Sequence, residues 1–319
     1  MKKFITGCII FLIPVIAIYA AVEYSLRQIP YAVKIKKEFA MNNREDIKIL
    51  ALGSSHFERG LNPQFMDSLT LNLGNSGQRI IENYRLLLKF EPLLPNLKLV
   101  IVELSYDWLE RNKSMTSPVV DNLNLVFYDV NTFERDVKPQ DYLLFPSNPD
   151  FFSNRLSEHI FNESALKFNK FGFDTNRFYG SYEAVQHQDS LIKDEDIYVE
   201  NATDPVAFSK NVKILNKFIE YCEKRKLKIL IYSTPTHYRY NRLRDKQIVQ
   251  RRDSVLQEFK QKYENLSVYI DEENPDFVTP FFYNGDHLNP TGAEKATKLL
   301  NEYIEKNIFT KQPSSKLSK

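Results

Sequence analysis

Glycine is scarce in this chain, with only nine in 319 residues, where an average composition would give roughly 22. Six of the nine fall in three short windows, which are Gly53 with Gly60, Gly74 with Gly77, and Gly285 with Gly292. Glycine is retained where the backbone must turn sharply or approach another group closely. The three windows are therefore the first places to look for a functional site.

Cysteine and excess charge are equally limited. Cys8 and Cys222 are the only cysteines, and their spacing is not that of a disulfide framework or a zinc site. The sequence has no metal-ligand spacing, phosphate-binding glycine loop or nicotinamide fingerprint, so we expect no metal and no cofactor. The formal net charge of +2 argues against a nucleic-acid partner. A hydrophobic content of 43% with 26% charged residues is typical of a folded globular protein.

The longest apolar run lies at the N-terminus, where Lys2 and Lys3 precede an uncharged stretch at 4–22. This stretch is long enough to cross a hydrocarbon layer of about 30 Å as a helix, whereas the apolar region of a signal peptide has only ~7–15 residues. We therefore expect a cytoplasmic N-terminus at 1–3 and a single-pass anchor at 4–22 in the cytoplasmic membrane, with a cleaved signal peptide as the alternative. Basic residues on both flanks leave the orientation open, and we expect an extracytoplasmic catalytic domain.

The rest of the chain alternates between apolar runs and helical patterns. After a basic linker or helix at 23–45, strands are expected at 47–53, 69–74, 97–104, 227–233 and 266–270. Near-continuous apolar strands that alternate with helices indicate a parallel sheet covered on both faces. We predict an α/β domain over 46–305, an aromatic-rich insertion within it at about 108–203, and a flexible tail at 306–319.

The glycine windows coincide with the ends of predicted elements, and sites in open α/β sheets form beyond the carboxyl ends of the strands. Ser55 follows the first strand on a turn that Gly53 permits, and His287 lies in "NGDHLNP" before the last helix. A nucleophilic serine needs a base at ~2.6–3.2 Å, and His287 is the candidate. Gly77, in "NLGNSGQR", could supply an amide N–H to a developing oxyanion. Each motif also has a structural interpretation, as a turn or a helix cap.

Three sequence blocks, "GSSH", "NLGNSGQ" and "NGDHLNPTGAEKAT", resemble the SGNH/GDSL hydrolase superfamily, in particular its membrane-anchored esterases and O-acyltransferases of the cell envelope. The resemblance covers about 46–107 and 205–305. It implies a flavodoxin-like three-layer sandwich and ester hydrolysis or acyl transfer on glycans or lipids. It also implies that Ser55, rather than Ser54, is the nucleophile, that His287 is the base, and that the amides of Ser55 and Gly77 form the oxyanion hole.

The chain departs from that superfamily at two places. The superfamily usually has aspartate three residues before the histidine, where this chain has Asn284. Asparagine can accept a hydrogen bond from the imidazole but cannot stabilise its charged form as a carboxylate does. Asp286 is the alternative orienting group, although on extended backbone its side chain would point elsewhere. The superfamily's oxyanion asparagine after the next strand is absent, and Asn75 or Ser105 could replace it.

Further polar side chains follow the strand at 227–233. Thr234, Thr236 and His237 either line the same cleft and contact substrate or have a structural role. His56 is expected to face away from the nucleophile or to shape the entrance. Arg59 is expected either to contact an anionic substrate or to lie in solvent.

The leading hypothesis is a membrane-anchored serine esterase or O-acyltransferase, most simply for an acetyl group. It would act through an acyl-serine intermediate on an acylated glycan or lipid of the envelope, with envelope biosynthesis proteins as partners and with the insertion selecting the acceptor. Hydrolysis and transfer use the same intermediate, so the sequence does not separate them. One alternative is a degenerate domain of the same fold that binds glycan or an assembly partner without catalysis. A purely structural membrane protein is another, and it leaves the placement of the glycines without a cause.

Overall fold

The computed structural model describes residues 1–115, 118–161 and 167–310. Its centre is a five-stranded sheet in the order β2-β1-β3-β4-β5, and every neighbouring pair is parallel. The strands are β1 (Ile49–Leu52), β2 (Thr70–Asn72), β3 (Leu99–Glu103), β4 (Lys228–Ser233) and β5 (Leu266–Ile270). The predicted α/β class with a central parallel sheet is confirmed.

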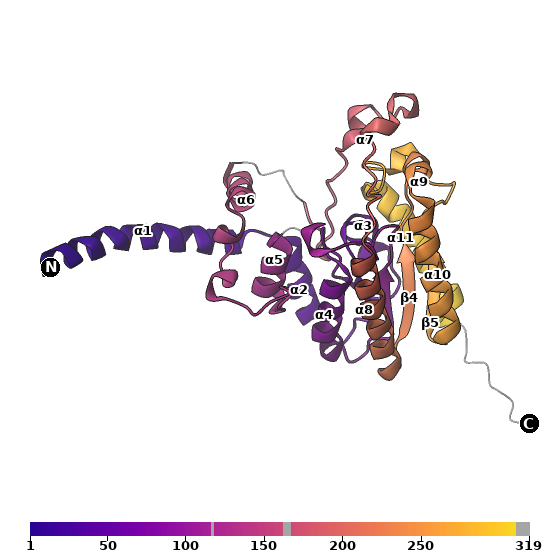
Figure 1. Ribbon diagram of the computed structural model, residues 1–319, viewed down its shortest axis with the longest axis horizontal. Coiled ribbons are helices and arrows are strands. Elements are labelled where there is room, and N and C mark those ends of the chain that lie inside the picture. Colours follow the sequence, from indigo (N-terminus) through magenta and orange to yellow (C-terminus); the bar gives the residue numbers. More distant parts are fainter. Residues whose placement is uncertain (116–117, 162–166, 311–319) are drawn as a thin grey trace, which may run out of the picture.

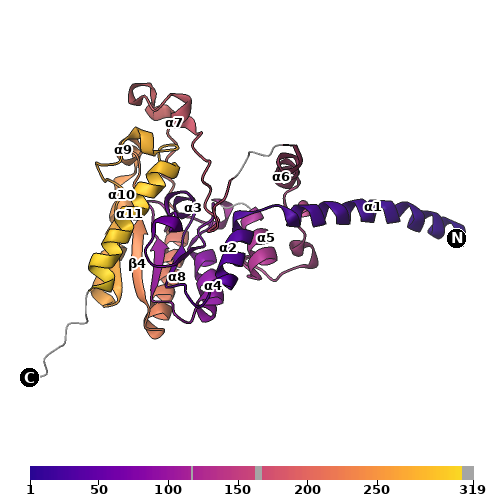
Figure 2. The same ribbon diagram turned by 180° about the vertical axis from the view of Figure 1, so that it is seen from behind.

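Helices cover both faces of this sheet (Figures 1 and 2). One face packs against α2 (Ala32–Asn42), α4 (Ile80–Phe90), α8 (Pro205–Lys224) and α10 (Lys246–Lys262), and the other against α3 (Ser55–Gly60) and α11 (Pro290–Ile304). The strand residues alternate between the two cores: Leu50 and Val100 face the first, whereas Ile49 and Leu99 face the second. Two-sided burial explains why the strands are apolar throughout.

The N-terminal helix α1 (Lys2–Gln28) projects away from the sheet domain (Figure 1). It is long and apolar enough to cross a membrane, and its most apolar window is fully exposed. At its base the Glu23 carboxylate accepts hydrogen bonds from the backbone N–H groups of Leu144 and Phe145, at 3.1 and 2.7 Å. These bonds attach the C-terminal end of α1 to the domain. By length and composition, α1 fits either a membrane anchor or a signal sequence.

The segment predicted as an insertion contacts the domain in two separate places. Its first part contains α5 (Pro118–Tyr128) and α6 (Pro149–Phe161), and buries Leu123 and Phe152 in the core beside α2. Its second part contains α7 (Ser181–Ala184), and Tyr182 packs with Phe282 and Leu288 from the loop before α11. A short helix, α9 (Tyr238–Leu243), follows β4 on the same side (Figure 1). The second part thus covers the edge of the sheet where the site is expected.

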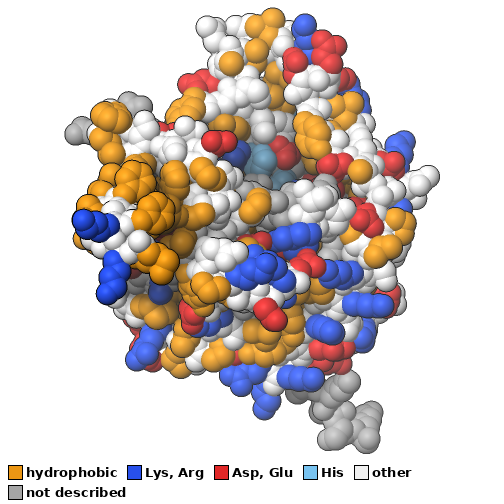
Figure 3. All heavy atoms as spheres, turned by 60° about the vertical axis from the view of Figure 1, so that its left-hand side comes forward, with side chains coloured by type: hydrophobic (Ala, Val, Ile, Leu, Met, Phe, Trp, Pro, Cys, Tyr) orange, Lys and Arg blue, Asp and Glu red, His pale blue; other side chains and the backbone are white. Residues whose placement is uncertain are grey.

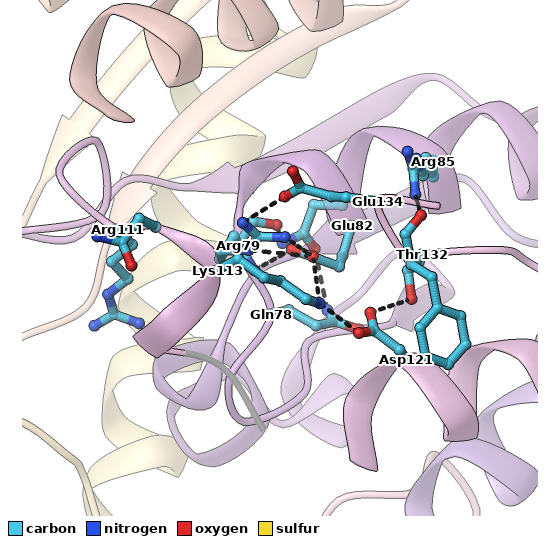
Figure 4. A network of polar contacts seen from close by, with 12 residues as sticks. Gln78, Arg79, Glu82, Arg85, Arg111, Lys113, Asp121, Thr132 and Glu134 are labelled. Carbon is cyan, nitrogen blue, oxygen red and sulfur yellow. Dashed lines mark hydrogen bonds and ion pairs between the residues drawn. The ribbon is translucent and has the colours of Figure 1, made fainter. Parts of the chain in front are cut away.

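A buried polar network connects the first part of the insertion to the loop after β2 (Figure 4). Arg79, which precedes α4, binds Glu82 at 2.5 Å and Glu134 at 2.8 Å. Burial opposes ionisation of Glu134, but hydrogen bonds from Lys210 and Arg79 lower its pKa to about 2. A buried charge is costly unless it is paired. The network therefore fixes the loop that carries Gly77.

Candidate active site

The turn between β1 and α3 is shaped around Gly53. A Cβ atom at this position would lie 2.6 Å from a Glu103 carboxylate oxygen and 2.7 Å from the Phe57 ring. Real Cβ atoms do not approach other atoms so closely, so the turn needs glycine here. The turn places Ser55 at the first position of α3, at the carboxyl edge of the sheet, where sites form in this class of fold.

The adjacent serine, Ser54, has a different environment. It is fully buried, and its N–H and hydroxyl donate to the Glu103 carboxylate at 2.5 and 2.7 Å. The Ser105 hydroxyl donates to the same carboxylate at 2.9 Å. Ser54 and Ser105 thus support the turn from below, and the suggestion that Ser105 replaces the missing oxyanion donor is wrong because its hydroxyl is committed to Glu103.

Ser55 and His287 are brought together from positions 232 residues apart, with 2.7 Å between Ser55 Oγ and His287 Nε2. This is hydrogen-bond distance, as a serine and its general base require. His287 lies just before α11, whose N-cap residue Asn289 accepts from the Gly292 N–H. This cap fixes the start of α11, and so fixes the residues just before it, which include His287.

Two oxygens face the other imidazole nitrogen of His287. Nδ1 lies 2.8 Å from Asp286 Oδ1 and 3.1 Å from Asn284 Oδ1. The expectation that Asp286 points elsewhere is wrong. Its premise was an extended backbone, but the Tyr283 N–H donates to the His287 carbonyl at 2.9 Å. This closes a tight turn on which Asn284 and Asp286 both reach the ring.

The electrostatics of this pair favour a neutral base beside an ionised acid. Burial lowers the pKa of His287 below its ordinary value, against the opposing effect of the Asp286 carboxylate. Burial alone would raise the pKa of Asp286, but the adjacent His287 lowers it well below its usual range. Near neutral pH, Nδ1–H can therefore donate to Asp286 while Nε2 accepts the proton of Ser55, the arrangement that general-base catalysis needs.

His56 lies beside His287, so the expectation that it faces away is wrong, whereas the alternative that it shapes the entrance stays a prediction. Its ring centroid lies 4.9 Å from that of His287, and its Nε2 lies 3.8 Å from Asp286 Oδ2. His56, Asp286 and His287 could also offer metal ligands, because one such atom from each lies within 4.8 Å of the others. A metal bound through His287 would compete with Ser55 or Asp286 for that ring. The metal site and the catalytic pair are therefore alternatives.

The loop after β2 lies beside the turn that carries Ser55. Gly77 has a φ of 81°, a conformation that favours glycine. The Asn75 N–H donates to the Gly53 carbonyl at 3.3 Å, and the Gln78 side chain donates to the same carbonyl at 2.8 Å. These bonds join the two loops at the edge of the sheet. The assignment of oxyanion donors to Ser55 and Gly77, with Asn75 as an alternative, remains a prediction.

The threonines after β4 are enclosed by the packing at this edge of the sheet. Thr234 and Thr236 are buried. The Thr234 hydroxyl lies 3.4 Å from His56 Nδ1, and that of Thr236 donates to Asn241 at 2.6 Å. Of the two interpretations, substrate contact or structure, the burial and bonding of both side chains favour the structural one.

His237 is enclosed in a similar way. It is fully buried, with its Nε2 3.1 Å from the Thr279 hydroxyl and its Nδ1 3.3 Å from that of Tyr182. Burial lowers the pKa of His237 to about 4. Polar residues in a loop after a strand can therefore pack at the edge of the sheet instead of lining a site. Their burial and hydrogen bonds distinguish the two cases.

The site itself is open to solvent. The side chains of His287 and Asp286 are 12% and 23% exposed. Figure 3 shows histidine side chains in a hollow beside acidic side chains, with hydrophobic side chains gathered to one side. The Arg59 guanidinium stacks over the Tyr283 ring, 4.8 Å from its centroid. Arg59 therefore packs against the protein and does not extend freely into solvent. A small ester can therefore reach the Ser55 hydroxyl.

No protein-family model and no curated protein matches the chain. Three solved structures are similar to it at low identity. One, provisionally assigned as a platelet activating factor from Streptococcus pneumonia, is 12% identical with a TM-score of 0.42, over 91% of this chain and 99% of that one. Another, provisionally assigned as an acylhydrolase from Bacteroides fragilis, is 11% identical with a TM-score of 0.40, over 84% and 94%. A GDSL-like lipase from Bacteroides thetaiotaomicron is 12% identical with a TM-score of 0.40, over 85% and 97%. Likenesses this distant carry no weight for an activity, which must be inferred from the site itself.

Proposed function

We propose that the protein is a serine ester hydrolase or O-acyltransferase of the SGNH/GDSL type, with Ser55 as nucleophile, His287 as base and Asp286 as orienting acid. The observation that carries this proposal is the 2.7 Å contact between Ser55 Oγ and His287 Nε2, with Asp286 2.8 Å from the other ring nitrogen. Asn284 supplies a second oxygen to that nitrogen. The position of Asp286 supports catalysis over a degenerate domain, because it supplies the carboxylate that Asn284 lacks.

The reaction follows from these positions. As Ser55 Oγ bonds to the acyl carbon, its proton passes to His287 Nε2, and Asp286 stabilises the resulting imidazolium. Backbone N–H groups, for which Ser55 and Gly77 are the candidates, stabilise the oxyanion. Collapse of the tetrahedral intermediate transfers the proton to the departing alcohol and leaves an acyl-serine. His287 then deprotonates water, which gives hydrolysis, or a sugar hydroxyl, which gives transfer.

The cellular setting is part of the same proposal. α1 anchors the protein in the cytoplasmic membrane as a single span, with the catalytic domain on the extracytoplasmic side. There the substrate is an acylated envelope glycan or lipid, with acetyl as the acyl group, and envelope biosynthesis proteins are the partners. A reporter enzyme that folds only outside the cytoplasm, fused to the C-terminus of the full chain, should be active. Activity of a cytoplasm-specific reporter instead would contradict this orientation.

A fluorophosphonate probe tests the catalytic assignment. The full chain in detergent should be labelled covalently, and Ser55→Ala should abolish the labelling. Ser54→Ala should still be labelled, because that hydroxyl is bonded to Glu103 and not to the base. Absence of labelling in the native protein, together with no hydrolysis of aryl acetates, would favour the non-catalytic alternative.

A further inference from the structure

A cavity of about 380 Å³ lies between the turn that joins α1 to α2 and the first part of the insertion. Its volume is in the range of small-molecule sites, ~300–1,000 Å³. Ile29, Tyr31 and Val33 form one wall, and Leu123 and Phe151 form another. The first wall begins directly after α1 ends at Gln28. In the proposed setting, this places the cavity at the point where the chain leaves the membrane.

The other end of the cavity lies at the catalytic edge. Glu58 and Asn75 contribute to its lining. Glu58 belongs to α3, the helix that Ser55 begins, and the Asn75 N–H is bonded to the carbonyl of Gly53. One cavity therefore extends from the residues that follow the apolar helix to Glu58 and Asn75, which are close in sequence or by hydrogen bond to the turn that carries Ser55.

The polar groups of the cavity favour an uncharged ligand. Its two arginines are paired with acids, Arg155 with Glu158 at 2.8 Å and Arg177 with Asp174 at 3.2 Å. Tyr31 is only 7% exposed, and its hydroxyl has no hydrogen-bond partner among the described residues. A buried polar group without a partner is costly. A ligand with an apolar chain and a neutral oxygen would fill the cavity and could satisfy this hydroxyl.

The surface beside the cavity is suited to a ligand drawn from a bilayer. α6 contributes to the lining through Phe151 and Arg155, and it ends in two exposed apolar side chains, Ile160 at 60% and Phe161 at 79%. α6 also packs near the base of α1, and the two helices lie close together in Figures 1 and 2. The apolar surface of α1 therefore continues onto α6.

We propose that this cavity binds the hydrocarbon chain of an uncharged, membrane-borne glycolipid and so presents an ester on its sugar to Ser55. This inference rests on the proposed function, because the ester is the bond that Ser55 attacks. It identifies the substrate as lipid-linked glycan rather than free polymer. It also gives the first part of the insertion a role, since Leu123 and Phe151 would contact the chain.

The test compares two glucosides that carry the same 6-O-acetyl group, one with an octyl and one with an ethyl aglycone, both below their micelle concentrations. Burial of one methylene group strengthens binding by about fourfold. The kcat/KM of the octyl glucoside acetate should therefore be at least tenfold higher than that of the ethyl glucoside acetate. Ala32→Phe narrows the cavity at a partly exposed lining position, and should reduce the ratio of kcat/KM for the octyl and ethyl substrates to less than about twofold. Ala32→Ser, with little added volume, should retain the preference.

A second measurement separates this inference from the proposed function. A diazirine-labelled octyl glucoside should crosslink, in the Ser55→Ala protein, to peptides containing 29–33 and 151–155. If neither acetate is hydrolysed but these peptides are labelled, the cavity assignment stands and the catalytic proposal fails. If both acetates are hydrolysed equally and the crosslinks lie elsewhere, the cavity assignment fails and the catalytic proposal stands.

Discussion

Two histidines near the carboxyl edge of the sheet each have a carboxylate and a hydroxyl beside the ring, but of the two only His287 is partly exposed. His287 has Ser55 Oγ at 2.7 Å and Asp286 Oδ1 at 2.8 Å. Both side chains of that His–Asp pair remain partly exposed. Ser55 follows a glycine turn at the end of β1, so its hydroxyl is presented at the rim of the sheet.

The second histidine, His237, has the same chemical neighbours in a closed setting. Its Nε2 lies 3.1 Å from Thr279 Oγ1 and 3.4 Å from Asp189 Oδ1, and its backbone N–H donates to the carbonyl of Gly285 at 2.9 Å. It is fully buried. At His287 the hydroxyl and the acid lie at opposite ring nitrogens, whereas at His237 Thr279 and Asp189 lie at the same nitrogen of an enclosed ring. The proposed mechanism needs the first arrangement, in which one nitrogen accepts a proton while the other is held by the acid.

Removal of the hydroxyl from each cluster should separate them most strongly. Ser55→Ala should lower kcat/KM for 4-nitrophenyl acetate by about 10⁴-fold or more, because the nucleophile is lost. Thr279→Ala should change it by no more than about threefold. Equal effects of the two substitutions would contradict the distinction drawn between the clusters.

Substitution of the acid should affect both the rate and the pH profile. Asp286→Asn removes the charge that stabilises the imidazolium, and kcat/KM should fall by about 10²-fold or more. The Asp286 carboxylate raises the pKa of His287 against the lowering by burial. Its loss should therefore lower that pKa and move the acid limb of the kcat/KM profile to lower pH. Asn284→Asp should move the limb the opposite way, since it adds a negative charge near the same nitrogen. An unchanged limb in both variants would exclude His287 as the titrating base.

The buried histidine, His237, should affect the pH dependence of the free energy of unfolding rather than the rate of ester hydrolysis. The pKa of His237 is about 4 in the folded protein and about 6.5 when exposed. The unfolded chain therefore binds the proton more tightly, and the free energy of unfolding should fall by about 3 kcal/mol as the pH drops from 6.5 to 4. His237→Gln should lose that part of the decline. Urea unfolding at both pH values measures it, and parallel declines in the two proteins would refute the assignment.

Substitution of Glu103, whose carboxylate binds the turn before Ser55, should have the smallest effect on activity and stability. The Glu103 carboxylate accepts hydrogen bonds from the Ser54 N–H and from the hydroxyls of Ser54 and Ser105. Glu103→Gln replaces one of its two acceptor oxygens with an amide N–H, which cannot accept them. We expect a loss of about 2 kcal/mol in stability and roughly tenfold in kcat with KM nearly unchanged. Ser105→Ala removes only one of these bonds and should cost less in both measurements. A larger loss in Ser105→Ala than in Glu103→Gln would show that Glu103 does not hold the turn.

The meeting of Ser55 and His287 at the edge of the sheet could be predicted from sequence because both positions depend on local backbone signals. Gly53 marks the end of β1 and the turn before Ser55, and the asparagine and proline after His287 mark the start of α11. The sheet could be predicted from its apolar strands, since burial on both faces leaves a continuous pattern. These features need only neighbouring residues to be recognised.

The remaining parts of the site depend on contacts between distant segments. Asp286 reaches the imidazole only because the loop at 283–287 closes on itself. The position of His56 beside His287 depends on how α3 meets that loop. The pairing of Arg79 with Glu134 leaves no periodic pattern, so the insertion reads as irregular although parts of it are well buried. Such details follow from tertiary packing and not from propensity.

The placement of the two reacting side chains also sets the order in which the site is completed during synthesis. The strand before Ser55 lies at the centre of the sheet, whereas the imidazole is contributed by the loop that leads into the last helix of the domain. His287 follows Ser55 by 232 positions, so the ribosome adds the imidazole long after the hydroxyl. In the proposed mechanism, the Ser55 hydroxyl of a nascent chain therefore lacks its base until the segment that carries His287 has docked.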